Sequence, residues 1–321
     1  MSNPCLYLVV PCYNESEVLD TTAKVLGFEK LRNLVANGKV SAASRILFIN
    51  DGSKDDTWMK ICFWHSQHPE TFSGLSLSRN RGHQNALLAG LLYAKDKADI
   101  VISLDADLQD DVDAIDEMID KYVNEECDIV YGVRSSRKKD SFFKRFTAES
   151  FYKIMSWSGV EIVFNHADYR LMSKRALEEL EKFSEVNLFL RGLVPLLGFK
   201  TGIVYYERGV RQAGQSKYPF KKMLSFAVDG ITSFSVTPLR FITKLGLTIF
   251  CLSILMLIYF CFRWYSGETV LGWASLICSV WAIGGLILFC LGIIGEYIGK
   301  IYKESKHRPR FIIDQIIDRN A

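Results

Sequence analysis

The chain has 321 residues, of which 49% are hydrophobic and 23% charged, and its formal net charge is +3. This composition excludes a disordered tail protein, and the small net charge gives no sign of a nucleic-acid-binding protein. The average hides a division, because no residue is charged from Leu245 to Phe262 or from Thr269 to Gly295. Each run is long enough to cross a bilayer, so the sequence excludes both a freely soluble protein and a transporter with many spans.

Short apolar runs alternate with helical patterns in the first part of the chain. The predicted strands, rich in Val, Ile and Leu, are Leu6–Val10, Arg45–Ile49, Leu75–Leu77, Ile100–Leu104 and Ile129–Val133. The helices predicted between them are Glu15–Leu26, His83–Lys95 and Val112–Val123. This alternation predicts an α/β domain whose mostly parallel sheet is covered on both faces. Ligands of such sheets bind beyond the carboxyl ends of the strands.

The second part of the chain adds elements that point to a membrane. Ser141–Trp157 has a helical pattern rich in aromatic and basic residues, and Phe199–Tyr206 is a predicted strand. Phe220–Phe234 is an amphipathic pattern that suits a helix in the membrane interface, although an ordinary core-facing helix fits it as well. The expected organisation is a cytosolic domain over 1–215, a juxtamembrane helix over 216–240, and a two-span hairpin with a cytoplasmic tail over 241–321. In that tail, Arg310–Ile317 could add a strand or contact a partner.

Charge distribution predicts how the chain is oriented in the membrane. No basic segment precedes the first apolar run, and Pro11 ends that run, so we expect no signal peptide. Basic residues gather before the first uncharged run and after the second, whereas the connecting segment Arg263–Glu268 is short. By the positive-inside rule, both termini and the N-terminal domain are expected in the cytoplasm of a two-span cell-membrane protein.

Polar side chains follow each predicted strand. Asp105 and Asp107 come directly after the fourth strand, and alternate residues of an extended segment face one side, so both carboxylates are expected to face one site. Hard oxygen ligands of this kind, with Gln109 nearby, suit Mg²⁺ or Mn²⁺. Such an ion would offset the charge that develops on a leaving diphosphate.

Two other polar motifs each leave two interpretations open. Asp51 lies in an Asp-Gly-Ser turn after the second strand, where it either bonds a nucleobase or ribose or only stabilises the turn. The segment from Arg211 to Tyr218, which includes Ser216 and Lys217, offers donors for phosphates. The same basic segment could be attracted to anionic lipid instead.

Taken together, the motifs resemble those of a known enzyme family. The motifs, in chain order, are Pro11-Cys12-Tyr13-Asn14-Glu15, Asn50-Asp51-Gly52-Ser53, Asp105-Ala106-Asp107-Leu108-Gln109-Asp110, Asp168-Tyr169-Arg170 and Arg211 with Ser216-Lys217-Tyr218. They resemble the family 2 glycosyltransferases with a GT-A fold. More narrowly, with the two C-terminal runs, they are similar to the polyprenyl-phosphate glycosyltransferases, which include dolichyl-phosphate mannose synthase and the bacterial bactoprenol glucosyltransferases.

The resemblance implies a role for each matching residue. The residues implied to bind the nucleotide sugar are Pro11, Tyr13, Glu15, Asp51, Asp105, Ala106 and Arg134. The implied metal ligands are Asp107 and Gln109, with Asp105 beside them. The residues implied to contact phosphates of donor or acceptor are Arg134, Arg211, Ser216 and Lys217. Asp168 matches the aspartate proposed as catalytic base, and Asp107 is the second residue expected to serve catalysis directly.

The reaction implied by the resemblance is inverting transfer of a hexose from a nucleotide sugar to a membrane polyprenyl phosphate. UDP-glucose is the first choice of donor, and UDP-N-acetylglucosamine or GDP-mannose are the alternatives. A phosphate monoester is largely dianionic at neutral pH, so we interpret Asp168 mainly as orienting the acceptor or Arg170. The alternative from another class is a membrane-tethered, non-catalytic nucleotide-binding scaffold. The sequence leaves open whether the chain forms homo-oligomers.

Three residues depart from the pattern that the resemblance leads us to expect. Asn50 stands where many relatives have a first Asp, Arg81 replaces a common aromatic residue, and Val112 stands where a Pro often follows. None of them removes an expected metal ligand. We therefore expect these departures to affect the choice of donor more than activity. A processive polysaccharide synthase is disfavoured, because Phe260 stands where the Gln of its Gln-x-x-Arg-Trp motif would be.

Overall fold

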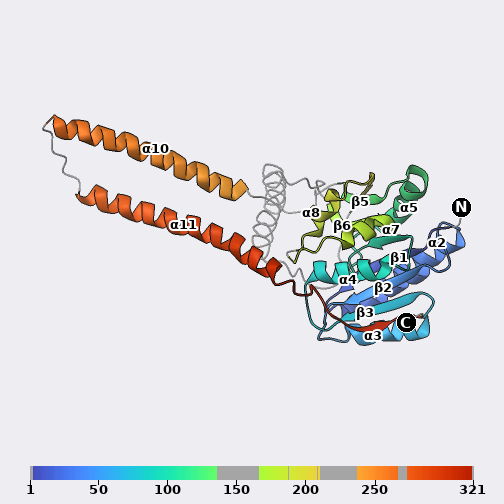
Figure 1. Ribbon diagram of the computed structural model, residues 1–321. Coiled ribbons are helices and arrows are strands. Elements are labelled where there is room, and N and C mark those ends of the chain that lie inside the picture. Colours follow the sequence, from blue (N-terminus) through green and yellow to red (C-terminus); the bar gives the residue numbers. More distant parts are fainter. Residues whose placement is uncertain are drawn as a thin grey trace.

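The computed structural model describes residues 3–135, 166–186, 188–207, 209, 237–266 and 273–319. Within these residues it shows a domain with an eight-stranded sheet, from which two long helices extend (Figure 1). The helices expected over Ser141–Trp157 and Phe220–Phe234 lie outside the described residues. The expected phosphate-binding residues Arg211, Ser216 and Lys217 lie outside them as well.

The sheet has the strand order β7-β5-β6-β4-β1-β2-β3-β8. Its strands are β1 (Leu6–Cys12), β2 (Arg45–Asn50), β3 (Phe72–Leu77), β4 (Ile100–Ser103), β5 (Ile129–Arg134), β6 (His166–Ser173), β7 (Thr201–Tyr206) and β8 (Ile313–Ile317). Strands β1, β2, β3, β4, β5 and β7 run in one direction, whereas β6 and β8 run in the opposite direction. The prediction of an α/β domain with a mostly parallel sheet is therefore confirmed, and the sheet is mixed.

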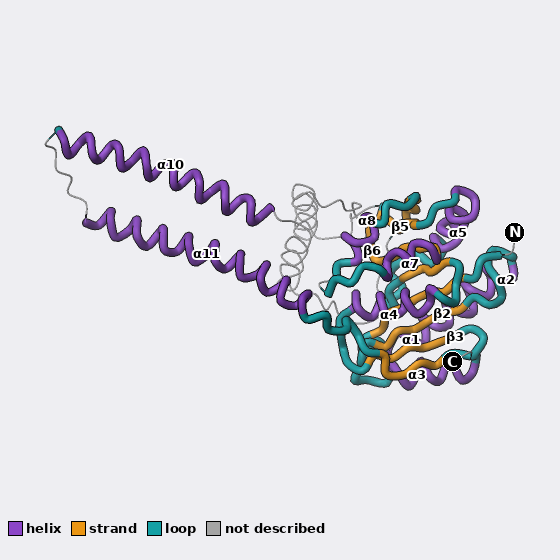
Figure 2. The backbone as a smooth tube through the Cα atoms, in the orientation of Figure 1, coloured by secondary structure: helices purple, strands orange, loops and turns teal. Residues whose placement is uncertain are grey.

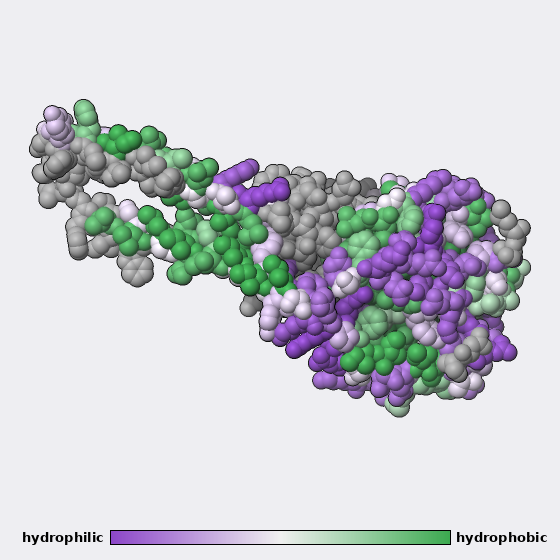
Figure 3. Space-filling view, in the orientation of Figure 1, coloured by the Kyte–Doolittle hydropathy of each residue, from purple (hydrophilic) through white to green (hydrophobic). Residues whose placement is uncertain are grey.

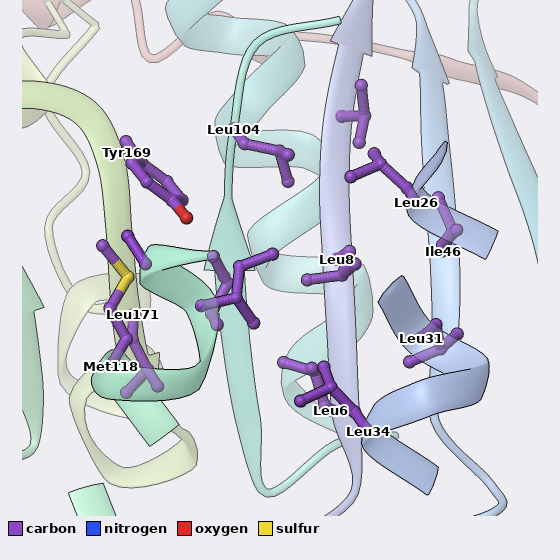
Figure 4. Packing of buried hydrophobic residues seen from close by; sticks show 14 of the residues in the cluster. Leu6, Leu8, Leu26, Leu31, Leu34, Ile46, Leu104, Met118, Tyr169 and Leu171 are labelled. Atoms are coloured by element: carbon purple, nitrogen blue, oxygen red, sulfur yellow. The ribbon is translucent and has the colours of Figure 1, made fainter. Parts of the chain in front are cut away.

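Helices cover both faces of the sheet because its central strands are apolar on both sides. In β1, Leu6 and Leu8 belong to one core and Tyr7 and Val9 to the other, and all four are buried. The first core includes residues of α1 (Ser16–Ala23), η1 (Lys24–Leu31), α2 (Arg32–Ala36), α3 (Thr57–Gln67) and α5 (Ala114–Glu125). The second includes residues of α4 (His83–Lys95), α7 (Lys174–Glu181) and α8 (Leu190–Leu196). Figure 4 shows part of the first core, which extends from the helices before β2, past β1, to Met118 of α5 and to Tyr169 and Leu171 of β6.

Observed elements depart from the predicted ones where local sequence is ambiguous. The helix expected over Glu15–Leu26 begins one residue later and continues through the π-helical η1 into α2. Helix α4 has the predicted bounds, and α5 begins two residues later than predicted. Strand β6 was not predicted. Its segment carries Asp168 and Arg170, charges that local pattern alone places at the surface, but these two side chains pair with each other.

Two long helices follow the domain. Helices α10 (Thr237–Tyr265) and α11 (Trp273–Ser305) lie side by side (Figure 2). Hydrophobic residues cover much of both helices, whereas the domain face seen in Figure 3 is mainly hydrophilic. Among the described residues, one helical segment, Ile283–Ser305, is long and apolar enough to cross a membrane. Side chains along it are strongly exposed, as at Leu288 (71%), which leaves an apolar surface available to lipid.

After α11 the chain returns to the domain and completes the sheet. Strand β8 pairs antiparallel with β3, so the tail adds a strand, one of the two alternatives expected for it. Beyond β8, the buried carboxylate of Asp318 accepts hydrogen bonds from Ser73, Tyr93 and Lys97 at 2.7–3.1 Å. Burial raises the pKa of Asp318, but the bonds from Lys97 and Tyr93 outweigh burial and lower that pKa. The carboxylate is thus an ionised anchor for the end of the chain.

The Asp318→Asn substitution is expected to loosen this anchor. It removes the charge that compensates the Lys97 ammonium, so the free energy of unfolding should fall by about 1–3 kcal/mol. Thermal unfolding of the detergent-solubilised chain measures the effect. Asp314→Asn is the control, because Asp314 is exposed in β8, the strand that Asp318 follows. Equal shifts in the two variants would contradict the anchoring role.

Candidate active site

The carboxyl ends of the parallel strands meet at one edge of the sheet, and the loops there bond to one another. The Asp51 N–H donates to the Cys12 carbonyl at 2.9 Å. The Asn14 N–H donates to Ser53 Oγ at 3.0 Å, and the Asn14 side chain accepts from the Lys54 N–H at 2.9 Å. These bonds join the end of β1 to the end of β2. Of the residues expected to bind the nucleotide here, Pro11 is buried in β1, Tyr13 is 36% exposed, and Glu15 precedes α1.

The Asp51 carboxylate fixes the loop that follows β3. It is 2% exposed and accepts the backbone N–H groups of Arg81 at 2.7 Å and Gly82 at 2.9 Å. Burial raises the pKa of Asp51, and the two backbone bonds offset this only in part. Gly82 has φ +86°, a conformation that favours glycine, and it immediately precedes α4. The structure therefore shows a loop-stabilising role for Asp51, and its expected contact with a nucleotide stays a prediction.

Asn50 has a structural reason to be an amide. Its side chain is buried, donates from Nδ2 to Ser76 Oγ at 2.9 Å, and accepts the Ser53 N–H at 3.0 Å. An ionised Asp could accept the second bond but could not donate the first. The amide thus links β2 to β3 and shapes the turn that carries Asp51.

The acidic motif after β4 lies in a turn. Strand β4 ends at Ser103, and Ala106 and Asp107 lie in a turn, so the expectation that an extended segment aligns the two carboxylates is wrong. Asp107 Oδ1 accepts the Gln109 N–H at 3.2 Å. The carbonyl of the buried Ala106 accepts a hydrogen bond from Thr22 Oγ1 at 2.6 Å. Asp105 has a side chain 42% exposed. The carboxylates thus lie at the edge of the sheet because the chain turns there, and not because they alternate along an extended segment.

The next acid in the motif, Asp110, is buried and is affected by the charges of the other two. Burial, then the charge of Asp105 and, less strongly, that of Asp107, raise the pKa of Asp110 to about 6, against opposing effects of Tyr206 and Arg134. Tyr206 donates to Asp110 Oδ1 at 2.5 Å, and Arg134 Nη2 lies 3.7 Å from the same oxygen. Arg134, at the end of β5, is thereby held next to the acidic turn. Sequence reasoning placed Arg134 in the site but did not single out Asp110 or Tyr206.

Asp168, at the start of β6, lies among cationic and polar groups from three other positions. Arg170 Nη2 donates to its Oδ1 at 2.8 Å, and Arg191 Nη2 donates to its Oδ2 at 3.1 Å. His83 Nε2 lies 3.7 Å from Asp168 Oδ2 and 3.7 Å from Asp105 Oδ1. Burial raises the pKa of Asp168, but Arg191, His83 and Arg170 together hold it well below its ordinary value. Asp168 is therefore an ionised carboxylate over the physiological range.

The structure brings the acidic turn and the expected catalytic aspartate together at His83, a residue that the sequence analysis did not identify as part of the site. Asp105 and Asp168 both lie next to His83, the first residue of α4. His83 ends the run of residues 78–83 after β3, which the sequence marks as one of the polar strand ends without singling out a residue in it. Arg191 lies in α8 outside any recognisable motif, so only the tertiary fold identifies it. Within the described part of the chain, no three His, Cys, Asp or Glu side chains are grouped as a metal site.

The pairing of His83 makes a prediction about pH. Burial lowers its pKa, but the nearby carboxylates of Asp168 and Asp105 outweigh burial and raise it from 6.5 to about 9. A raised pKa contributes stability that is present below pH 6.5 and lost as the pH rises through about 9. Because its side chain is 33% exposed, the contribution should be only about 1 kcal/mol. Unfolding of the metal-free chain between pH 6.5 and 9.5 measures it.

His83→Gln should flatten that pH dependence, with His68→Gln as its matched control. The His68 side chain is equally exposed, at 33%, but it precedes β3 and so lies at the opposite edge of the sheet. The prediction fails if both variants keep the wild-type pH dependence.

Comparison of the sequence with known proteins identifies its family. Residues 7–181, more than half of the chain, match the model described as Glycosyl transferase family 2, and residues 237–301 match the GtrB C-terminal hairpin. The glycosyltransferase YkoT of Bacillus subtilis (strain 168) is 53% identical, over 98% of this chain and 92% of its own. The bactoprenol glucosyl transferase of Shigella phage SfV is 40% identical, over 95% of this chain and 97% of its own. Among solved structures, the mannosyltransferase PcManGT from Pyrobaculum calidifontis, in complex with GDP-Man and Mn²⁺, aligns over 96% of this chain and 88% of its own, with TM-score 0.45 and 15% identity. By its sequence match, the chain belongs to glycosyl transferase family 2.

Proposed function

We propose that the chain is a membrane glycosyltransferase that moves a hexose from a nucleotide sugar to a polyprenyl phosphate with inversion at the anomeric carbon. The observation that carries the proposal is the convergence of Asp105 and Asp168 on His83, at 3.7 Å each. We infer from this contact that an acidic turn suited to a metal–diphosphate lies beside a cationic cluster suited to an anionic acceptor. The 40% identity to a bactoprenol glucosyl transferase supports the lipid acceptor. UDP-glucose is the donor we propose, with UDP-N-acetylglucosamine and GDP-mannose as alternatives.

The residues of the acidic turn fit Mg²⁺ or Mn²⁺ by the chemistry of their donors. Asp105, Asp107 and Gln109 offer hard oxygen atoms in one short turn, and the Asp105 side chain is 42% exposed. Such ions usually keep waters and take substrate phosphates as further ligands. The site therefore does not need a group of three His, Cys, Asp or Glu side chains. When bound, the ion supplies positive charge that stabilises the leaving diphosphate.

The acceptor needs little help to become a nucleophile. A phosphate monoester has a second pKa near 6 and is largely dianionic at neutral pH. One of its oxygens forms the bond to the anomeric carbon as the bond to the nucleoside diphosphate breaks. Asp168 is already ionised, yet its charge is taken up by Arg170 and Arg191, which makes it a weak base. We propose that its task is orientation, and that Arg134, Arg211, Ser216 and Lys217 contact phosphates.

We propose that α10 and α11 both cross the membrane, with the catalytic domain and both termini in the cytoplasm. Strand β3 precedes the two helices and β8 follows them, and the two strands pair in one sheet. A chain with both strands on one side must cross an even number of times. The match of residues 237–301 to a C-terminal hairpin supports the same arrangement. The division into 1–215, 216–240 and 241–321 is part of this proposal, with the tail's last strand returning to the first unit.

The reaction is tested with a panel of donors in membranes supplied with undecaprenyl phosphate. UDP-glucose, UDP-N-acetylglucosamine and GDP-mannose are offered separately, and the lipid product is identified by its mass. Asp107→Ala and removal of divalent ions should each reduce turnover by about 100-fold or more, because both take away stabilisation of the leaving group. Asp111→Ala, an exposed acid in the same segment, is the control. Absence of nucleoside diphosphate release with every donor would favour the non-catalytic scaffold.

The topology is tested by labelling with a membrane-impermeant maleimide. In intact cells, Ser266→Cys, just after α10, should react, whereas Asp314→Cys, in β8, should react only after the membrane is permeabilised. Both residues are exposed, so accessibility on the protein is matched. Each change is made in a chain whose eight native cysteines are replaced by serine and whose activity is retained. Labelling of Asp314→Cys in intact cells would contradict the proposed orientation.

A further inference from the structure

Asp168 is contacted by two guanidinium groups and lies beside the His83 ring. Two guanidinium groups, those of Arg170 and Arg191, bond to it. The Arg170 side chain is 1% exposed and is enclosed by the protein, whereas that of Arg191 is 29% exposed. Of the two guanidinium groups, that of Arg191 therefore lies on the open side of the cluster, where a substrate group can reach it.

The open side is built from two helix starts that are fastened together. Helix α4 begins at His83 and α8 begins at Leu190, and the Leu190 N–H donates to Gln84 Oε1 at 3.0 Å. This bond brings the His83 ring and the Arg191 guanidinium to the same carboxylate, with His83 Nε2 3.7 Å from Asp168 Oδ2. On its other side, the same ring nitrogen lies 3.7 Å from Asp105, so the cluster borders the acidic turn.

We propose that Arg191 and His83 together bind a phosphate group of a substrate, and that Asp168 is a positioning residue that holds Arg191 in place. This inference rests on the proposed function and names residues for it. A guanidinium carries five N–H donors in a planar fork that matches phosphate oxygens, and its bonds to Asp168 use Nε and Nη2. The donor diphosphate and the acceptor phosphate monoester share this chemistry.

Kinetics of Arg191→Gln test the proposal and distinguish the two phosphates. Loss of a charge-assisted bond should raise the KM of one substrate by about 10- to 100-fold. A rise for the polyprenyl phosphate assigns the site to the acceptor, and a rise for the nucleotide sugar assigns it to the donor. Unchanged KM values for both substrates, whatever happens to kcat, overturn the proposal. Arg191→Lys, which keeps the charge but loses the fork, should lie between wild type and Arg191→Gln.

Arg175→Gln is the matched control. Arg175 also bonds through Nε and Nη2 to one aspartate, Asp128, but this pair joins the start of β5 to the end of β6, at the opposite edge of the sheet. Arg175→Gln should keep both KM values within about twofold of wild type. A KM change equal to that of Arg191→Gln would show a general effect of losing an arginine–aspartate pair, and would overturn the assignment.

The role of Asp168 is tested by combining substitutions. If Asp168 acts through Arg191, Asp168→Asn raises the same KM as Arg191→Gln, and the double variant is no worse than Arg191→Gln alone. If Asp168 is a base, Asp168→Asn lowers kcat without moving that KM, and the effects of the two substitutions multiply. The second result overturns the positioning role.

A binding measurement keeps this inference separable from the proposed reaction. Millimolar pyrophosphate or inorganic phosphate, added without divalent ions, should raise the thermal midpoint of wild type and of Arg175→Gln but not that of Arg191→Gln. Failure of the donor panel together with this pattern would reject the reaction and retain the phosphate site. Equal stabilisation of all three proteins would reject the site, whatever the donor panel shows.

Discussion

The site depends on the compensation of one largely buried negative charge. An unpaired carboxylate in the position of Asp168 would be strongly unfavourable, and the fold meets that cost with Arg170 from the same strand and Arg191 from α8. Arg170 is itself enclosed, and burial lowers its pKa, so it too requires the carboxylate. The electrostatic requirement therefore fixes β6 and α8 relative to each other and, through His83, brings α4 into the same arrangement.

The antiparallel insertion of β6 explains why this carboxylate lies near the acidic turn. Parallel strands bring their carboxyl ends to one edge of the sheet, and a strand that runs the other way brings its beginning there. Strand β6 lies between β4 and β5, so Asp168, near its start, neighbours Asp105 at the end of β4 and Arg134 at the end of β5. A purely parallel sheet would have placed the start of this strand at the far edge.

The sequence predicted those strands whose local hydrophobic pattern agrees with their burial in the fold. The apolar runs of β1, β2, β4 and β5 are buried on both faces, which makes them recognisable without any tertiary information. Sequence reasoning missed β6 because Asp168 and Arg170 satisfy each other only after folding. It expected the carboxylates of Asp105 and Asp107 on an extended segment after the fourth strand, because nothing local shows that the chain turns at Ala106 and Asp107. Arg191 is brought to Asp168 across 23 residues of sequence, a separation that no spacing rule connects.

The return of the chain to β3 has a consequence for how the protein is made. Ser73 and Asp318, which bond to each other, are 245 residues apart in sequence. During synthesis, the edge of β3 stays without its partner strand until α10 and α11 have been translated. If both helices insert into the bilayer as proposed, completion of the sheet reports that insertion has occurred with the correct orientation, since a tail left on the wrong side could not reach β3. The last strand would then join membrane integration to final folding of the catalytic domain in a single step.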